Sequence, residues 1–375
     1  MIAAVAPGHD ATVGGTVPAG RARTLAQVYR RFAVVDAAGT SPLYERVAVA
    51  LSESDQALRA IEAAPARKRH PPLILAALHD LALAGRAPAL AAAYAARDGE
   101  AAADAAIHTL VRRTDAVVAI AVRRKTQTFE TARCAVLYPA IAEAAHRVGA
   151  HAVGLVDVGG SAGLNLQVDR LGITYSNGQA LGDPSSPVQL SSSVVGDRPL
   201  PTQTMPAVVA RVGIGLDPVD VTDADDARWL RAGLPPDQPE RAASLDTELA
   251  LAATAPPLLL HGNAVEVLPD AFARIPAEAL PVVTTTWAMS RFPIERRLRF
   301  LRRLDETAGG RALAWVSVEG VGVAPAIPTL GDRRASGHSI IGLAVFDGST
   351  PRAEALGRCW SRGRFLSWLA SPSGS

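Results

Sequence analysis

The residues best suited to chemistry lie in one stretch, from Val153 to Arg170, with the sequence V-G-L-V-D-V-G-G-S-A-G-L-N-L-Q-V-D-R. An apolar run typical of a buried parallel strand leads to an acid and then to a turn that carries three glycines. Glycine lets a ligand approach the backbone, and the start of a following helix offers free N–H groups and a positive dipole end. We expect cofactor contacts from Asp157, Gly159, Ser161, Gly163 and Asn165.

A polar segment at residues 123–130, R-R-K-T-Q-T-F-E, joins two predicted helices just before this stretch. We expect Gln127, Glu130 and Arg133 to face the glycine-rich turn and to bind a polar substrate. Arg124 or Arg133 suits a carboxylate or phosphate, because a guanidinium group can hold either with two parallel hydrogen bonds. The alternative is that a threonine of this segment simply caps the next helix.

Four residues are candidates for proton transfer, and one of them is Glu130 of the polar segment. His261 ends a predicted strand at the carboxyl edge of the sheet, where ligands bind in open α/β proteins. His79 lies in an apolar helix, where a hydrogen-bonded core histidine is the alternative. Glu45 follows Ser41 and Pro42, a typical helix start, so it is either a base in a pocket or a first-turn charge that stabilises the helix.

Three further residues are candidates for substrate contact. Tyr44 precedes Glu45 on the same predicted helix. Trp287 and Arg291 follow the fourth predicted strand, close to the expected site, although the tryptophan ring also suits packing in the core.

The spacing of apolar residues divides the chain into elements that would position these side chains. Residues 1–22 are rich in glycine and proline and are predicted to form a flexible arm. Residues 23–150 show apolar residues at three-to-four spacing, which predicts an all-helical cap or substrate domain. Residues 151–375 alternate short apolar strands with helices, which predicts a Rossmann-like parallel sheet that ends in an antiparallel hairpin. Residues 179–205 form an insertion that is either a lid or lining loop or a surface excursion.

The predicted fold class is α/β, with seven strands in the order of a class I methyltransferase-like sheet. The strands are expected at Val153–Val158, Val208–Leu216, Pro257–Gly262, Pro281–Trp287, Ala312–Glu319, Ser339–Phe346 and Ala353–Trp360.

Composition narrows the class of partner. The chain has 375 residues, 49% of them hydrophobic, and a net charge of +2, which gives no electrostatic reason for binding nucleic acid or a membrane surface. No apolar run approaches the length of a membrane span, and the first residues do not resemble a signal peptide. Cys134 and Cys359 are expected to be reduced thiols in a cytoplasmic protein, and no metal-binding spacing occurs.

Taken in order, several motifs resemble a bacterial family, common in actinobacteria, known as domain of unknown function 2332. The motifs are S-P-L-Y-E (41–45), P-P-L-I-L-A-A-L-H (71–79), R-R-K-T-Q-T-F-E-T-A-R-C (123–134), D-V-G-G-S-A-G-L-N-L (157–166), G-I-G-L-D-P-V-D-V (213–221), H-G-N-A (261–264) and F-L-S-W-L (365–369). The resemblance covers nearly the whole chain from Leu25. It implies a helical N-terminal part on a methyltransferase-like sheet, but it supplies no reaction, since a fold hosts many functions.

Compared with a typical S-adenosylmethionine site, two acidic positions are altered. The expected pattern G-x-D-x-x-P has Gly215 at its acidic place, and Asp217 follows two residues later in the same strand phase. The usual G-D after the third strand is replaced by Gly262 and Asn263. Phe129 stands where the family prefers asparagine, which indicates a changed pocket. Each lost charge-assisted hydrogen bond costs roughly 1.5–3 kcal/mol, so cofactor affinity is expected to fall unless Asp217 substitutes.

Three functions fit these observations. We favour a small-molecule enzyme of specialised metabolism that catalyses nucleophilic substitution at carbon and has lost S-adenosylmethionine, for example in ring closure of a sulfate- or phosphate-activated substrate. The alternative is an S-adenosylmethionine-dependent methyltransferase. The third is a non-catalytic subunit that acts with a partner protein or as a homodimer.

Overall fold

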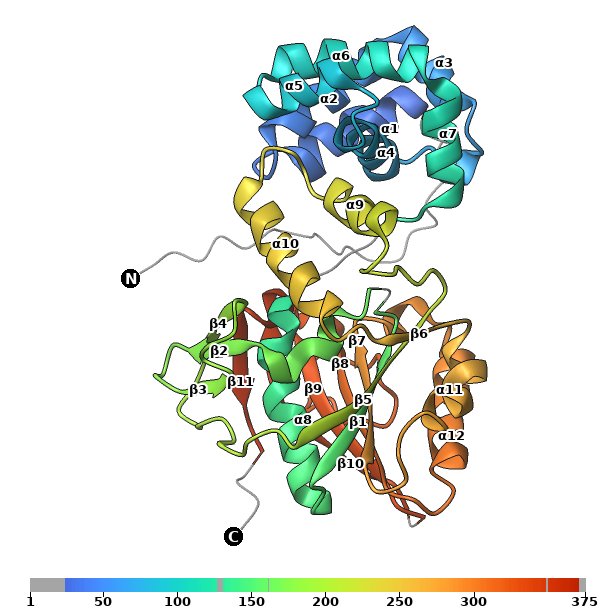
Figure 1. Cartoon of the computed structure of the whole chain (residues 1–375). Coiled ribbons are helices and arrows are strands. Elements are labelled where there is room, and N and C mark those ends of the chain that lie inside the picture. The colour runs from blue at the N-terminus through green and yellow to red at the C-terminus, as the bar shows by residue number, and fades with distance from the viewer. Residues whose placement is uncertain (1–23, 127–130, 161, 349, 371–375) are drawn as a thin grey trace.

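The computed structural model describes residues 24–126, 131–160, 162–348 and 350–370, so the predicted arm at residues 1–22 lies outside the described residues. Helices of the N-terminal part gather at one end of the molecule, and a large mixed sheet with helices against it forms the other end (Figure 1). Helices α9 and α10 lie between the two parts.

The helices that precede the first strand are short and locally well specified. Ser41, for example, accepts a hydrogen bond from the backbone N–H of Tyr44, and Pro42 takes the first helical position of α2. Their bounds are α1 (Leu25–Phe32), η1 (Ala33–Ala37), α2 (Pro42–Glu53), α3 (Asp55–Glu62), η2 (Ala66–Lys68), α4 (Pro71–Leu83), α5 (Pro88–Ala96), α6 (Gly99–Arg112), α7 (Thr114–Arg123), η3 (Thr131–Arg133) and α8 (Cys134–Val148).

Two apolar clusters show which helices belong together. Helices α1 to α7 share a core built around α4, and α9 (Ala224–Ala232) adds Trp229 to it. Helix α8 instead packs on the sheet, where Leu137 and Ile141 lie in one cluster with Leu155 of the first strand. The apolar contacts therefore do not divide the chain at residue 150.

Among the described residues, the sheet contains eleven strands, so the predicted number of seven is wrong. Their order is β3-β2-β4-β11-β10-β9-β8-β7-β1-β5-β6. All seven predicted strands are present, namely β1 (Ala152–Val158), β5 (Ala207–Gly215), β6 (Leu258–His261), β7 (Leu280–Thr286), β8 (Leu313–Gly320), β9 (Ser339–Phe346) and β10 (Arg352–Trp360). The four that sequence reasoning missed are β2 (Gly172–Tyr175), β3 (Ala180–Gly182), β4 (Gln189–Val194) and β11 (Phe365–Trp368).

Two of the missed strands lie within residues 179–205, the segment predicted as an insertion, so this segment is not wholly a loop. This segment contains β3 and β4, which extend the sheet, with β4 paired in parallel to both β2 and β11. The strands are short and partly exposed, and β4 has the sequence Q-L-S-S-S-V, so they lack the apolar run or alternation that marks a buried strand.

Five central strands, in the order β6-β5-β1-β7-β8, are parallel. In chain order this is 3-2-1-4-5, which places a topological switch point between β1 and β7. The predicted antiparallel hairpin is formed by β9 and β10, and β9 also pairs antiparallel with β8. The remaining helices are α10 (Pro239–Ala253), α11 (Ala264–Phe272) and α12 (Ile294–Ala308), with short turns η4 (Leu164–Arg170), η5 (Met289–Arg291), η6 (Arg334–Ser336) and η7 (Ser361–Gly363).

Within the described part of the chain, no single helix has both the length and the apolar character needed to cross a bilayer. Helices α4 and α5 reach that length only together, and the chain bends by 101° between them.

Candidate functional site

A cavity of about 350 Å³ opens at the carboxyl ends of β1, β5 and β6, beside the switch point. We call it the switch-point pocket. Its apolar wall contains Val158, Ile214, Leu216, Ala264, Ala288 and Phe292. Its polar and glycine positions are Lys125, Thr126, Gly159, Gly215, Asp217, Gly262, Asn263, Arg291 and Arg296. A cavity of this size, with a few polar groups in an apolar lining, is typical of a small-molecule site.

Asp157 lies beneath the glycine-rich turn and is fully buried. Thr284 donates a hydrogen bond of 2.8 Å to its Oδ1, and Asn165 donates one of 3.2 Å to its Oδ2. Burial raises the pKa of this carboxyl, and the two hydrogen bonds oppose that rise. Because the side chain has no solvent-accessible surface, it positions the turn from below and does not line the pocket.

The glycines of the turn are required by the structure. A Cβ on Gly160 would lie 1.9 Å from Oδ2 of Asp157, and Gly159 has a φ of +88°. After Gly163 the expected helix is a seven-residue 3-10 helix, η4, without a side-chain cap. The N–H groups at its start are therefore less well aligned than those of the α-helix that the sequence predicted.

Residues from three separate segments meet over the end of β7. The guanidinium of Arg133 lies 5.1 Å from the centre of the Trp287 ring and donates a hydrogen bond of 3.4 Å to the backbone oxygen of Thr286. Asn165 contacts both Asp157 and Thr286. Four predicted site residues, Asp157, Asn165, Arg133 and Trp287, thus form one connected group.

Trp287 itself has an unusual backbone. Its φ is +53°, a left-handed conformation that is costly for a bulky residue and that gathers at functional sites. Two hydrogen bonds hold it there, one from its backbone N–H to the oxygen of Val318 and one of 2.8 Å from Nε1 to Oγ of Ser339.

The acid and amide predicted after the second and third strands both line the switch-point pocket. Asn263 also caps α11, since its Oδ1 accepts the N–H of Val265 and its Nδ2 donates to Glu266. Asp217 lies just beyond the end of β5. Lys68 lies close enough for Asp217 to raise its pKa, although burial outweighs this and lowers the lysine's pKa.

Several predicted residues have roles in the helical part instead. The imidazole Nδ1 of His79 lies 3.0 Å from the backbone oxygen of Leu234, and burial lowers the pKa of His79 to about 4. Tyr44 packs edge-on against Tyr94, with ring centres 6.4 Å apart. Glu45 lies in the first turn of α2, at the positive end of its dipole.

Two more predicted residues lie apart from the connected group. Arg124 forms an ion pair with Asp226 and lies over the ring of Trp229, so it ties α9 to the helices. His261 ends β6, exposed, opposite Gly215, and is not among the residues that line the pocket. Gln127, Phe129, Glu130 and Ser161 lie outside the described residues.

Sequence reasoning missed Glu319, at the carboxyl end of β8. Its side chain is buried, and Oε1 accepts the backbone N–H groups of Ala288 at 3.0 Å and Met289 at 3.1 Å. Burial raises its pKa to about 7, although these hydrogen bonds act in the opposite direction. The signal was available, because Glu319, like Asp157, is an acid that ends an apolar strand.

A second and larger cavity, of about 770 Å³, lies between α10 and the strands β2, β4 and β11. We call it the edge pocket. Its charged lining residues are Arg241, Glu248 and Arg364. No sequence signal pointed to it, because none of the three strands that line it, β2, β4 and β11, was predicted.

Comparison with known proteins identifies a family for this chain but assigns no reaction to it. The family described as "Uncharacterized protein conserved in bacteria (DUF2332)" matches residues 26–368. No curated protein and no solved structure matches the chain.

Proposed function

We propose that this chain, which belongs to the DUF2332 family of uncharacterized bacterial proteins, is an enzyme that catalyses nucleophilic substitution at carbon on a small anionic substrate. The charge of the switch-point pocket carries the proposal. Among the described residues that line it, Lys125, Arg291 and Arg296 are cationic and Asp217 is the one acid. This balance suits an anionic ligand better than the cationic sulfonium group of S-adenosylmethionine.

The proposed reaction forms one bond and breaks another at the same carbon. A hydroxyl or amine of the substrate attacks a carbon that carries a sulfate or phosphate ester. The carbon–oxygen bond breaks, its electron pair leaves on the anion, and the nucleophile's proton passes to the carboxylate of Asp217. Arg291 and Arg296 stabilise the charge that develops on the leaving group. When nucleophile and ester belong to one molecule, the product is a ring.

The group around Asp157 supports this site from below. The buried carboxylate, Thr284 and Asn165 fix the turn that forms the pocket floor at Gly159. Such preorganisation matters because a leaving anion is stabilised only by donors that already lie where its charge develops. Arg133 and Trp287, over the end of β7, do not line the pocket, and they are the proposed contacts for a part of the substrate that extends beyond it.

The alternative, an S-adenosylmethionine-dependent methyltransferase, is favoured by the glycine-rich turn and by Asp217 at the end of β5. A carboxylate there would accept both ribose hydroxyls. Methyl transfer to a nucleophile would then replace ester cleavage.

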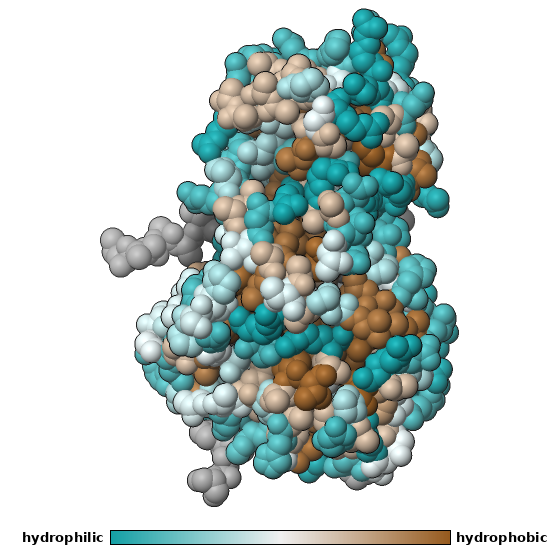
Figure 2. Space-filling model, in the orientation of Figure 1, coloured by the Kyte–Doolittle hydropathy of each residue, from teal (hydrophilic) through white to brown (hydrophobic). Residues whose placement is uncertain are grey.

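A non-catalytic subunit would be favoured by a wide exposed apolar face on the helical part. On the face drawn in Figure 2, the brown side chains of that part lie in small groups divided by polar ones. We therefore rank this function third.

Isothermal titration of the full chain separates the first two functions. With inorganic sulfate and pyrophosphate as probes, we expect binding that weakens at least tenfold in Arg291→Gln and is unchanged in Arg302→Gln, an exposed arginine of α12 outside both pockets. We expect no heat from S-adenosylmethionine or S-adenosylhomocysteine at millimolar concentration. Micromolar binding of either, lost in Asp217→Asn, would establish the methyltransferase alternative and overturn the proposal.

A further inference from the structure

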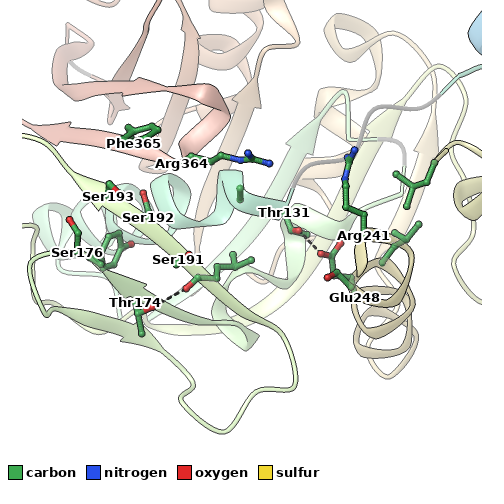
Figure 3. A pocket seen from close by; sticks show the side chains of 16 residues that line it. Thr131, Thr174, Ser176, Ser191, Ser192, Ser193, Arg241, Glu248, Arg364 and Phe365 are labelled. Atoms are coloured by element: carbon green, nitrogen blue, oxygen red, sulfur yellow. Dashed lines mark hydrogen bonds between the residues drawn. The ribbon is translucent and has the colours of Figure 1, made fainter. Parts of the chain in front are cut away.

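The edge pocket has the features of a built site, and it is separate from the switch-point pocket. Figure 3 shows Arg364 reaching into it from the side of β11 and Arg241 rising from α10, with Ser191, Ser192 and Ser193 along β4. Two guanidinium groups facing one cavity repel each other in the absence of an anion, and the described lining residues supply one carboxylate, that of Glu248, against them.

Arg364 is held in place by a strained turn. The three residues before it, Ser361, Arg362 and Gly363, have φ values of +47°, +57° and +101°. Two consecutive non-glycine residues in the left-handed region are energetically costly, and such strain persists only where the surroundings impose it. Backbone strain of this kind is often found beside binding sites.

The surroundings that impose the strain are visible. Ser192 donates a hydrogen bond of 2.7 Å to the oxygen of Gly363, and the N–H of Ser193 donates one of 2.8 Å to the oxygen of Arg364. On the other side a Cβ at Gly363 would lie 2.6 Å from the oxygen of Ala132. The turn η7 is therefore clamped between β4 and η3, and Arg364 follows directly from it.

The opposite wall is equally ordered. Arg241 donates to Oε1 of Gln238 at 2.8 Å, which fixes one end of its guanidinium. Buried Thr131 donates a hydrogen bond of 2.6 Å to Oε1 of Glu248, so the carboxylate faces the pocket from a fixed position (Figure 3).

We propose that the edge pocket is a second small-molecule site and that it binds a hydroxylated anion, of the class of sugar phosphates and hydroxy acids. Arg241 and Arg364 bind the anionic group, because guanidinium forms paired hydrogen bonds with phosphate and carboxylate alike. The hydroxyls of β4 other than that of Ser192, which already donates to Gly363, and the carboxylate of Glu248 hydrogen-bond to the ligand's hydroxyls. At about 770 Å³, the cavity is large enough for a molecule of this class.

This site does not depend on the proposed reaction at the switch point, and its test keeps the two apart. Isothermal titration would use glucose 6-phosphate and citrate as probes, with glucose as the neutral control. We expect binding by the wild-type chain, at least tenfold weaker binding in Arg364→Gln and in Arg241→Gln, and wild-type binding in Arg302→Gln. Arg291→Gln, which alters only the switch-point pocket, is expected to leave this binding unchanged.

Phenylglyoxal, which modifies exposed guanidinium groups, locates the ligand directly. With the better of the two probes bound, mass spectrometry is expected to show Arg241 and Arg364 protected and Arg302 modified. All four arginines changed for these tests are exposed, so the variants are expected to fold. Absence of binding for both anions, or binding that is lost in Arg291→Gln and kept in Arg364→Gln, would overturn the proposal.

Discussion

At the scale of a single residue, the buried carboxyl of Glu319 is expected to make the protein's stability depend on pH. Its pKa is raised from 4.5 to about 7, so between these values the folded state binds a proton that the unfolded state does not. Stability from this group is therefore present below pH 4.5 and is lost as the pH rises through 7, by up to roughly 3 kcal/mol. His79 acts in the opposite sense, because its pKa is lowered to about 4. The effect of Glu319 is therefore masked when the stability of the wild-type protein is measured without a variant for comparison.

The variant Glu319→Gln separates the two groups, because both proteins retain His79. We expect urea unfolding to show the wild type losing stability relative to the variant as the pH is raised from 4.5 to 7.5. A difference between the two proteins that is constant over this range would mean that Glu319 titrates normally.

Gly160 provides a second prediction at the scale of one residue. Alanine there would place its Cβ 1.9 Å from Oδ2 of Asp157, so either the turn or the carboxylate must move. We expect Gly160→Ala to cost about 1–3 kcal/mol of stability, as overpacking does, and to weaken anion binding at the switch-point pocket.

The cause can be checked with a double-mutant cycle. Asp157→Ala removes the atom that Gly160→Ala would clash with, so the double variant is expected to lose less stability than the sum of the two single losses. Additive losses would show that the contact between these two residues is not the source of the effect.

Among the elements, β4 shows how a polar strand can belong to a sheet. The N–H of Ser193 bonds to Arg364 and that of Val195 bonds to Leu366, so both amides are tied to the β11 segment. We expect hydrogen exchange at these two amides to be much slower than at Asp197, in the loop that follows. Similar rates at all three positions would indicate a loop and would also remove one wall of the edge pocket.

Strand β4 is also an example of what the sequence does not predict about the fold and the site. The strands β1, β7, β8 and β9 are mostly apolar and are buried on both faces, and a run of this kind can be recognised without knowing which strand pairs with it. The short strands β2, β3, β4 and β11 exist because they pair with one another and with β10, a fact that no local pattern records.

The candidate site follows the same rule. Asp157 and Asn165 were found because a strand, an acid and a glycine-rich turn are adjacent in the chain. Arg133 was found because it follows a polar segment just before that stretch, and Trp287 because it follows a strand at the carboxyl edge of the sheet. Arg241 and Arg364 are 123 residues apart in the sequence and line the same cavity, and the place of Arg364 depends on the unpredicted pairing of β4 with β11. A site that depends on such pairing is not visible until the register of the strands is known.

On the scale of the whole molecule, the loop between α9 and α10 joins these two helices to the start of α2. Asp237 in this loop accepts a hydrogen bond of 2.6 Å from the hydroxyl of Ser41 and one of 3.1 Å from the N–H of Leu43, at the start of α2. A carboxylate is favoured there, since it faces the positive end of the helix dipole and satisfies an N–H that the helix leaves free.

Asp237→Ala is therefore expected to destabilise the protein by about 1–2 kcal/mol, the cost of losing a helix cap and a charge-assisted hydrogen bond. Urea unfolding measures the loss, and hydrogen exchange should rise first in α2, where the freed groups lie. Asp305→Ala, at an exposed position of α12, is the matched control and should change stability by less than about 0.5 kcal/mol. If both variants behaved alike, the contact of Asp237 with Ser41 and Leu43 would not stabilise the protein. Other contacts, such as the ion pair between Arg228 of α9 and Asp80 of α4, would then hold α9 and α10 against the helices.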